Sequence, residues 1–352
     1  MISPSFSQQL LSWYRAYKRD LPWRATNDPY AILVSEIMLQ QTQVERVKDY
    51  FTRWLEIFPD ISALAQADEE TVFKQWEGLG YYARARNLHH AAKLLCHGNK
   101  EIPDSRDELL SLPGIGPYTA AAVLSIAFNK DEPLVDANVE RVLSRYCNVA
   151  SPVKSREAQE IFWQTVGELL PSGKAGEFNQ ALMELGALVC LKKNPHCSSC
   201  PVRQGCQAYC LGITNQRPVQ APRKKIIPID MACGVLEDDG LFFIQKRLKN
   251  DVWAGLWEFP GGCLKDNEIP ADTVIREYRE ETELEVHNIR PIETVQHSYM
   301  NYRVTLHGFL CDLKKKKQQP VLHAAQECRW VEKTELDNYA FPAGHRKLIS
   351  LL

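Results

Sequence analysis

The hydrophobic residues follow a helical period through the first part of the chain and a strand-like alternation after it. Apolar positions three and four residues apart are typical of amphipathic helices, whereas every second position is typical of half-buried strands. We expect strands at 231–236, 241–247 and 303–311. We expect a helix and then a turn at 6–24, and further helices at 28–39, 46–58, 69–76, 84–95, 105–111, 119–124, 156–189 (two helices) and 270–282.

The pattern therefore predicts a helical domain followed by an α+β domain. Between them, residues 215–225 are polar and basic and are interrupted by two prolines, which is typical of a linker. A chain of 352 residues also favours two domains over one. We predict a first domain at 1–212, a linker at 213–228 and a second domain at 229–352.

The composition is that of an ordinary globular protein, with 45% hydrophobic and 24% charged residues. The net charge of −2 argues against a strongly basic coat for nucleic acid, but it allows a local basic face. No apolar run is long enough to span a bilayer, and residues 1–7 lack the pattern of a secretory signal. Without such a signal, eleven cysteines favour metal or cluster ligation over disulfides.

A two-glycine turn at 112–116 leads directly into a strongly helix-forming run at 119–124. Glycines let the backbone approach a ligand closely, and the helix that follows begins with unpaired N–H groups. Gly114 and Gly116 therefore predict a backbone anion site suited to a nucleic-acid phosphate. About twenty residues further on, Asp136 lies in an apolar run, where a carboxylate is costly without a role or a partner.

Glu36 interrupts a helix that is apolar on nearly every side and is therefore expected to be buried. Two interpretations remain open: a surface acid at a helix edge, or a buried acid with a raised pKa. The apolar neighbours on both sides favour the buried acid, and acids of that kind gather at functional sites.

A second glycine-flanked turn lies at 78–82, where two tyrosines are followed by Arg84 and Arg86. One interpretation is a pair of core tyrosines in a loop. The other is an aromatic wedge with phosphate-contacting arginines, as in proteins that push bases out of a duplex. The turn alone does not decide between them.

Four cysteines follow the last helix of the first part, separated by six, two and five residues: Cys190, Cys197, Cys200 and Cys206. Zinc sites more often carry two Cys-x-x-Cys pairs with a long gap between them. A single such pair flanked by single cysteines fits four-cysteine ligation of an iron–sulfur cluster better. Four unrelated buried cysteines are the alternative.

Residues 7–210 resemble the helix-hairpin-helix DNA glycosylases of the endonuclease III type. The resemblance is carried by LPGIGPYTA at 112–120, by Asp136 within VDANVERV, and by the C-x6-C-x2-C-x5-C loop. Within that superfamily, the chain is similar to the adenine DNA glycosylase (MutY) family in SEIMLQQTQV at 35–44, GLGYYARARNLH at 78–89 and FNQALMELGALVC at 178–190. The resemblance implies an all-α glycosylase domain with a [4Fe-4S] cluster loop. It also implies a monomer in the bacterial cytoplasm, associated with the nucleoid, with no membrane partner.

The resemblance further implies roles for individual residues. Glu36 is expected to protonate adenine at N7, and Asp136 to stabilise the cationic sugar of an oxocarbenium-like state. Tyr118 and Asn138 are expected to support Asp136. The residues implied to bind the substrate DNA are Arg19, Trp23 and Gln180 around the flipped adenine, Gln41 and Tyr81 inserted into the duplex, and Leu39.

Tyr118 separates two reactions. Endonuclease III-like enzymes with lyase activity carry a lysine at this position, whose amine can form a Schiff base and cut the strand. Since Tyr118 has no such amine, we predict a monofunctional enzyme that removes adenine mispaired with 8-oxoguanine or guanine in double-stranded DNA. The alternative within the same fold is a glycosylase for oxidised pyrimidines.

Residues 229–352 resemble a Nudix (MutT-like) domain, which the family's adenine glycosylases use to recognise 8-oxoguanine opposite the adenine. Where the family's lesion-reading loop typically has Phe-Ser-His, this chain has Tyr299, Met300 and Asn301. The serine contact is therefore missing. We expect other groups, such as Asn301, to read the lesion, or the recognition to be weaker.

The same domain carries a nearly complete Nudix box from Gly262 to Glu281. Glu277, Glu280 and Glu281 are candidate Mg²⁺ ligands on one helix face, since Mg²⁺ takes oxygen ligands. Glu283 replaces the late glycine of the box. Two interpretations remain open: a charged, solvated helix face, or a working site that also hydrolyses oxidised nucleoside triphosphates.

Overall fold

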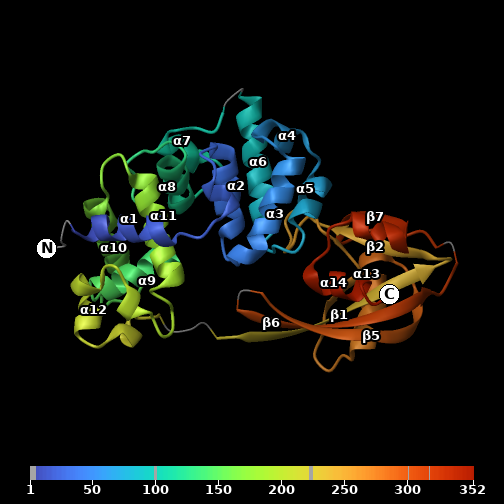
Figure 1. The fold of residues 1–352 in the computed structure, drawn as a ribbon. Helices are drawn as coiled ribbons and strands as arrows, with labels where there is room; N and C mark the ends of the chain where they lie inside the picture. Colours follow the sequence, from blue (N-terminus) through green and yellow to red (C-terminus); the bar gives the residue numbers. More distant parts are fainter. Residues whose placement is uncertain (1–4, 99–100, 222–224, 300, 317) are drawn as a thin grey trace. The chain divides into compact units, whose positions relative to one another are not determined.

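The computed structural model describes residues 5–98, 101–221, 225–299, 301–316 and 318–352 (Figure 1). The chain forms two compact units. The first contains Met1–Gln66 and Asn87–Arg223, and the second contains Ala67–Arg86 and Lys224–Leu352. The predicted domain boundaries at residues 212 and 229 stay a prediction. Ala67–Arg86, which lies within the predicted first domain, belongs to the second compact unit.

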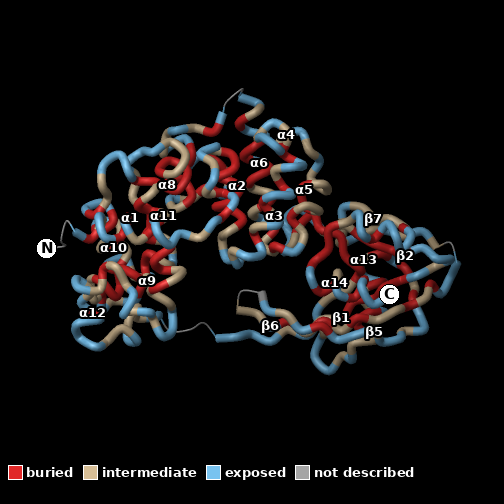
Figure 2. Tube along the Cα trace, in the orientation of Figure 1, coloured by how far each residue is buried: buried red, intermediate tan, exposed pale blue. Residues whose placement is uncertain are grey.

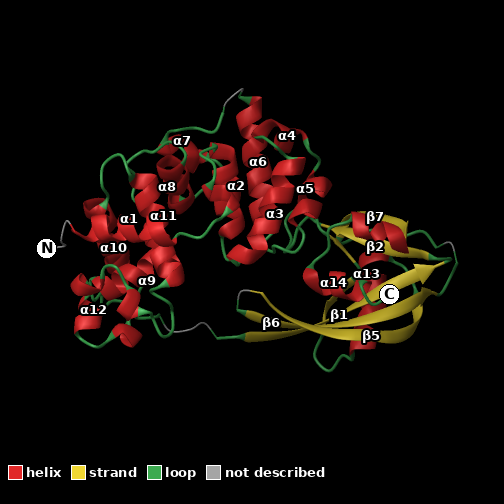
Figure 3. Cartoon of the chain, in the orientation of Figure 1, coloured by secondary structure: helices red, strands yellow, loops and turns green. Residues whose placement is uncertain are grey.

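The described residues of the first unit form helices and loops, with no strand among them (Figure 3). Its α-helices are α1 (Ser5–Tyr17), α2 (Pro29–Leu39), α3 (Val44–Ile57), α4 (Ile61–Gln66), α7 (Arg106–Ser111), α8 (Pro117–Ile126), α9 (Ala137–Tyr146), α10 (Arg156–Leu169), α11 (Ala175–Leu188) and α12 (Gln207–Cys210). Its short 3-10 turns are η1 (Pro22–Arg24), η2 (Cys197–Ser199), η3 (Arg203–Gly205) and η4 (Thr214–Gln216). Helix α6 (Ala83–His97) begins in the second unit and ends in the first.

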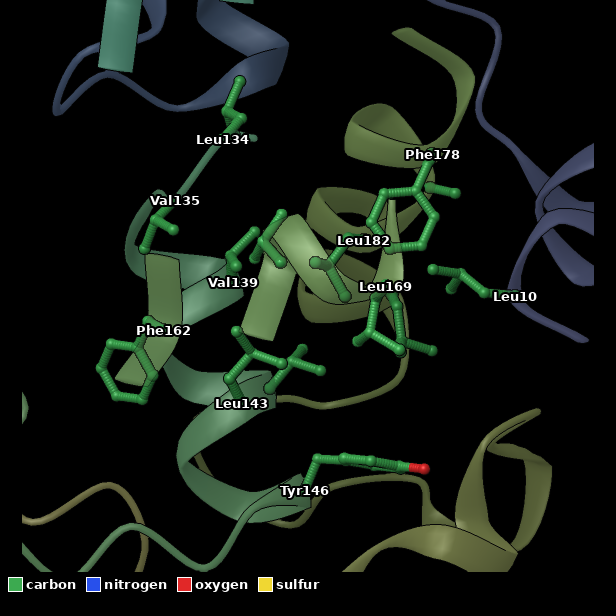
Figure 4. Packing of buried hydrophobic residues seen from close by; sticks show 14 of the residues in the cluster. Leu10, Leu134, Val135, Val139, Leu143, Tyr146, Phe162, Leu169, Phe178 and Leu182 are labelled. Carbon is green, nitrogen blue, oxygen red and sulfur yellow. The ribbon is translucent and has the colours of Figure 1, made fainter. Parts of the chain in front are cut away.

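The core of the first unit joins α1 to helices that lie more than a hundred residues later in the chain (Figure 4). Leu10 of α1 packs in one apolar cluster with Leu143 of α9, Phe162 of α10 and Leu182 of α11. Each helix contributes side chains three or four positions apart, so that one stripe of every helix is buried.

Helices α2 and α8 are buried on nearly all sides (Figure 2). Helix α2 starts where Asp28 accepts hydrogen bonds from the backbone N–H groups of Tyr30 and Ala31, and Pro29 occupies its first turn. The two helices pack against each other. The prediction that the helix carrying Glu36 is buried is therefore confirmed.

The second unit is an α+β fold, as predicted (Figure 3). Its strands are β1 (Ile227–Asp238), β2 (Leu241–Arg247), β3 (Trp257–Glu258), β4 (Gly261–Cys263), β5 (Val286–Tyr299), β6 (Tyr302–Leu313) and β7 (Ala325–Glu332). Its helices are α5 (Glu69–Trp76), α13 (Pro270–Thr282) and α14 (Ala343–Ile349), with the 3-10 turn η5 (Lys333–Asn338). The strand order is β3-β2-β1-β6-β5, with β4 paired to β1 and β7 paired to β2. Only β1 and β6 pair in parallel among the described strands.

Alternate residues along β1 and β2 face opposite sides of this sheet, because successive side chains of a strand point to opposite faces. One face carries Cys233, Val235, Phe242 and Ile244 together with Leu348 and Ile349 of α14. The other carries Ala232, Leu236 and Phe243 together with Val274 and Tyr278 of α13. A helix therefore covers each face of the sheet.

Candidate active site

A cavity of about 200 Å³ opens in the first unit where α2, α8, the start of α9 and α11 meet. Eight of the residues that the sequence singled out line it: Arg19, Trp23, Glu36, Leu39, Tyr118, Asp136, Asn138 and Gln180. Side chains separated by more than a hundred positions in sequence thus surround one space. The cavity brings the two predicted acids to the same site.

Glu36 is almost fully buried at this cavity, with 4% of its surface exposed. The Tyr118 hydroxyl donates a short hydrogen bond to Glu36 Oε2. Burial raises the pKa of Glu36 to about 7; the Tyr118 hydrogen bond opposes this rise, and the charge of Asp136 adds to it. Glu36 can therefore hold and release a proton near neutral pH, and the buried interpretation of this acid is confirmed.

Asp136 is the N-cap of α9. Its Oδ1 accepts a hydrogen bond from the backbone N–H of Val139 at 2.7 Å, and its Oδ2 accepts one from Asn138 Nδ2 at 2.7 Å. Burial raises the pKa of Asp136, while these two donors lower it. The first turn of α9 therefore supplies the hydrogen-bond donors that a carboxylate needs in apolar surroundings. These donors hold the Asp136 carboxylate in one orientation.

Asn138 is held in turn by Arg141, one turn further along α9. Arg141 Nη2 donates to Asn138 Oδ1 at 2.8 Å and to the carbonyl of Gly186 at 2.7 Å, while Nε donates to the carbonyl of Cys190 at 2.7 Å. At Gly186 a Cβ would lie 2.5 Å from Asn138 Cβ. The start of α9 is therefore tied to the end of α11 and to the first cysteine of the cluster loop.

Sequence reasoning missed a buried charge cluster on the same cavity. Glu184 has no exposed side-chain surface and pairs with Arg19 at 2.6 Å and with Arg24 at 2.8 Å. Burial alone would raise the pKa of Glu184, but hydrogen bonds from Arg24 and Arg19 outweigh it and lower the pKa to about 2. Glu184 lies four residues after Gln180 on α11, so the shared helix face was the signal that pointed to it.

Gln180 itself is engaged within the first unit. Its Oε1 accepts a hydrogen bond from the Tyr14 hydroxyl at 3.3 Å, and its Nε2 donates to the carbonyl of Gly176 at 3.1 Å. An amide fixed at both ends presents its remaining hydrogen-bonding capacity in a defined direction.

The two glycines of the predicted anion-binding turn, Gly114 and Gly116, have different surroundings. Gly114 has φ +79°, and a Cβ there would lie 2.7 Å from Asn87 Cβ. Gly116 has no neighbour within 4 Å of such a Cβ and is the N-cap of α8, with no side-chain cap on its first-turn N–H groups. Gly114 is therefore required by the fold, whereas Gly116 leaves the helix end open to a ligand.

We expect Gly114→Ala to lower the thermal stability of the protein, because a left-handed φ costs an L-residue about 1–2 kcal/mol before the clash with Asn87 is added. Gly116→Ala is the matched control and should fold normally while binding duplex DNA more weakly. Thermal melting and duplex binding at one salt concentration measure both. Equal melting temperatures of the two variants would contradict the assignment.

The remaining predicted DNA contacts are spread over the chain. Gln41 is exposed in the first unit with φ +56°, and Tyr81 lies in the second unit with φ +50°. Asn301 also lies in the second unit, where its carbonyl accepts a hydrogen bond from Ile227 N at 2.9 Å. Met300 and the side chain of Tyr299 lie outside the described residues.

Two family models match the chain. The model described as HhH-GPD superfamily base excision DNA repair protein matches residues 34–168, and the NUDIX domain model matches residues 231–351. The adenine DNA glycosylase of Buchnera aphidicola subsp. Baizongia pistaciae is 37% identical over 75% of each chain. That of Mus musculus is 33% identical over 99% of this chain and 78% of its own.

The chain belongs to the adenine DNA glycosylase family. Membership makes it a base-excision-repair enzyme that acts on an N-glycosyl bond in DNA. Among the residues described, no helix is both long enough and apolar enough to cross a bilayer.

Solved structures share the fold of the helical part. A thermostable thymine-DNA glycosylase has a TM-score of 0.54 and 31% identity, covering 58% of this chain and 95% of that one. A non-covalent endonuclease III–DNA complex has a TM-score of 0.51 and covers 60% of this chain and 99% of that one; at 23% identity it shows the fold alone.

The cysteine loop of this family member follows α11. Its four cysteines line a small cavity of about 30 Å³ together with Arg145, Arg203 and Tyr209. Arg145 is buried, and its Nη1 donates to Cys190 Sγ at 3.2 Å. Burial raises the pKa of Cys200 to about 12, and the charges of the other three sulfurs add to the rise.

The four sulfurs share the lining of one cavity. No three His, Cys, Asp or Glu side chains of the described residues are placed to hold a single metal ion. Four neighbouring half-buried thiols with a buried arginine beside them fit a cluster with several metal atoms.

The Nudix-box carboxylates of the second unit each have partners. Arg276 Nη1 donates to Glu277 Oε1 at 2.6 Å and to Glu280 Oε2 at 3.0 Å, and Lys265 Nζ donates to Glu280 Oε1 at 3.2 Å. A Mg²⁺ ion at these groups would have to displace both cations.

Glu281 accepts a hydrogen bond from Gln245 Nε2 at 2.9 Å, and burial raises the pKa of Glu281 to about 8. A metal ligand must be ionised, so this pKa weakens metal binding at neutral pH. Glu283 follows α13 with φ +56°, the left-handed conformation that glycine adopts most readily. The Mg²⁺ site stays a prediction.

Proposed function

We propose that this family member excises adenine paired with 8-oxoguanine or guanine in double-stranded DNA, and that it does so without cutting the strand. The observation that carries the proposal is the pair formed by Glu36 and Asp136 at one cavity: a buried acid with a pKa of about 7 and a carboxylate held by two donors. One group can supply a proton while the other remains an anion.

In this mechanism Glu36 donates its proton to N7 of the extruded adenine, which turns the base into a better leaving group. The C1′–N9 bond breaks, and its electron pair leaves with the base. The sugar becomes oxocarbenium-like, and the fixed carboxylate of Asp136 stabilises that positive charge. Water then adds to C1′ and gives up a proton to the Glu36 carboxylate, which leaves an abasic sugar and restores the acid. Tyr118 holds Glu36 through its hydroxyl, and Asn138 holds Asp136 through its amide.

The adenine-binding surface is supported by groups that are already ordered. Trp23 is buried against Phe51 with ring centroids 5.6 Å apart, and Glu184 holds Arg19 and Arg24 in place. Side chains that do not need to be ordered on binding lose less entropy when a base enters. Leu39 adds apolar surface to the same cavity.

The absence of strand cleavage rests on Tyr118. Its hydroxyl is engaged with Glu36, and no amine stands at this position to form a Schiff base. Reading of 8-oxoguanine is assigned to the second unit, with Asn301 as the candidate contact. A monomeric state and a place on the bacterial nucleoid stay predictions of the sequence.

The proposal is tested with labelled duplexes that contain A:8-oxoG, A:G, A:T or an oxidised pyrimidine. Strand breaks at adenine opposite 8-oxoguanine or guanine that appear only after alkali are the expected result. Borohydride should trap no covalent complex. Cleavage at the oxidised pyrimidine without alkali would instead favour the endonuclease III-like alternative.

We also propose that Cys190, Cys197, Cys200 and Cys206 hold a [4Fe-4S] cluster. When bound, the cluster supplies covalent cross-links that fix the loop after α11. The purified protein should contain about four iron and four sulfide per chain and show a visible absorbance band. Cys200→Ser should lose both, whereas Cys210→Ser, an exposed cysteine of the same region, should lose neither. One zinc per chain would show that the cluster assignment is wrong.

A further inference from the structure

The segment Ala67–Arg86 belongs to the same compact unit as the C-terminal sheet, although the helix-hairpin-helix family model covers it. The segment makes both polar and apolar contacts with Lys224–Leu352, which we call the C-terminal body. Lys246 Nζ donates to Glu70 Oε1 at 2.7 Å, and Arg86 Nη2 donates to the carbonyl of Ala254. Phe73 lies against Gly255, where a Cβ would be 3.0 Å from its ring.

The strongest of these contacts lies directly before the 78–82 turn. Glu77 Oε1 accepts hydrogen bonds from Arg346 Nε at 2.9 Å and from the backbone N–H of Phe341 at 3.0 Å. Glu77 Oε2 accepts from Arg346 Nη2 at 3.2 Å and from Lys74 at 2.6 Å. The two carboxylate oxygens and the guanidinium form a two-point pair, which fixes direction as well as distance.

The same stretch of the C-terminal body also holds the far end of the turn. The Tyr82 hydroxyl donates to the carbonyl of Phe341 at 3.4 Å, and both side chains are buried. Residues 341–346 therefore fasten the turn on both sides of Tyr81. We call this set of contacts, made by Glu77 and Tyr82 with Phe341 and Arg346, the turn clamp.

Between the two fastened ends the backbone is tightly folded. Gly78 and Gly80 have φ +98° and +73°, and Tyr81 has φ +50°. Arg84 Nη2 donates to the carbonyls of Leu79 and Gly80 at 3.0 and 2.9 Å. A non-glycine residue keeps a left-handed conformation only where its surroundings hold it.

We propose that Arg346, acting through Glu77, is a positioning residue for Tyr81, so that the C-terminal body holds the tyrosine that enters the duplex. The proposal rests on the proposed function and on the role that the family resemblance implies for Tyr81, which is insertion into the duplex. A side chain that unstacks bases must be fixed before it meets them, since misplacement by about 1 Å can cost a hundredfold in rate. The C-terminal body thereby contributes to base extrusion as well as to any reading of the lesion.

The test compares Arg346→Met with the unchanged protein in single-turnover excision on two duplexes. One contains A:8-oxoG, and the other contains the same adenine opposite an abasic site, where no partner base has to be separated from it. We expect Arg346→Met to be about tenfold slower on A:8-oxoG and within about twofold on the abasic duplex. Arg290→Met, which removes a surface pair with Asp312 on the same body, is the control and should leave both rates unchanged.

A double-mutant cycle then separates positioning from general damage to the fold. In a Tyr81→Leu background, Arg346→Met should cause no further loss on A:8-oxoG, because the residue that it positions is gone. Glu77→Gln, which keeps the shape and removes the charge, should reproduce the selective defect if Arg346→Met is too unstable to assay.

Equal slowing on both duplexes, or a full additional loss in the Tyr81→Leu background, would overturn the proposal. An A:8-oxoG rate that does not change in Arg346→Met or Glu77→Gln would also overturn it. These outcomes are distinct from failure of the proposed function, in which the unchanged protein would not excise adenine opposite 8-oxoguanine.

Discussion

Replacement of Glu36 by glutamine should slow adenine excision by about 10²–10⁴-fold while duplex binding stays the same, because the substitution removes the general acid and little else. Glutamine has the same shape and can still accept the hydrogen bond that the Tyr118 hydroxyl donates to Oε2. The measurement is the single-turnover rate on A:8-oxoG duplex, with binding to an uncleavable substrate analogue as the companion.

The pH dependence of the unchanged protein provides a second test of the same residue. Burial raises the pKa of Glu36 to about 7, so the acid is protonated below that pH and loses its proton above it. The active form is the protonated one, and the excision rate should therefore fall by up to about tenfold per pH unit above about pH 7. This descending limb should be absent in Glu36→Gln. A variant that keeps the full rate, or a rate that rises through pH 8, would contradict the role of Glu36.

Asp136→Asn should lower the excision rate by about 10²–10³-fold, which is the loss seen when a preorganised charge is removed from a developing ion. The fold should be largely retained, because asparagine is as good an N-cap as aspartate and can accept the same hydrogen bond from Val139 N. The hydrogen bond from Asn138 Nδ2 is lost, since the asparagine amide would face it with a donor. Single-turnover excision and thermal melting of the same preparation measure the two effects.

Asp136→Ala is the matched control for the structural part of this residue. It removes the cap as well as the charge, so it should lower stability by about 1 kcal/mol relative to Asp136→Asn while the two rates remain similar. Near-normal excision by Asp136→Asn would show that the Asp136 side chain only caps α9. The positive charge on the sugar would then have to be stabilised by another group.

Local sequence was sufficient for several features of the site. Glu36 is buried because the helix around it is apolar on every side, and a side chain on such a helix has no solvent to face. The turn that contains Gly114 is also local, because a left-handed backbone such as its φ of +79° is a property of a few adjacent residues. The predicted role of Gly114 at a phosphate stays a prediction.

The specific roles of Glu36, Asp136 and Tyr118 came from the resemblance to the family rather than from the pattern of residues. The pattern alone left a surface acid open as an alternative for Glu36, and Asp136 was only a carboxylate in need of a partner. The cavity that these three residues line shows why they belong together.

Other features depended on partners distant in the sequence. The helix face that Glu184 shares with Gln180 does not identify its partners, Arg19 and Arg24, because those arginines lie about 160 residues earlier. In the same way, only the packed structure ties Asn138 through Arg141 to the carbonyl of Cys190. A buried charge is stable only beside its partner, and that partner is chosen by packing.

The helical and α+β parts, the glycine turns and the cysteine spacing are predictable from the chain, and a buried Glu36 is favoured, since each follows from residues within one or two turns of chain. Packing of distant segments places Ala67–Arg86 with the C-terminal sheet and Arg346 against Glu77 beside the Tyr81 turn. The reason is physical: hydrophobic period and backbone preference act over a few residues, whereas an ion pair forms between whichever side chains the fold brings within about 3 Å.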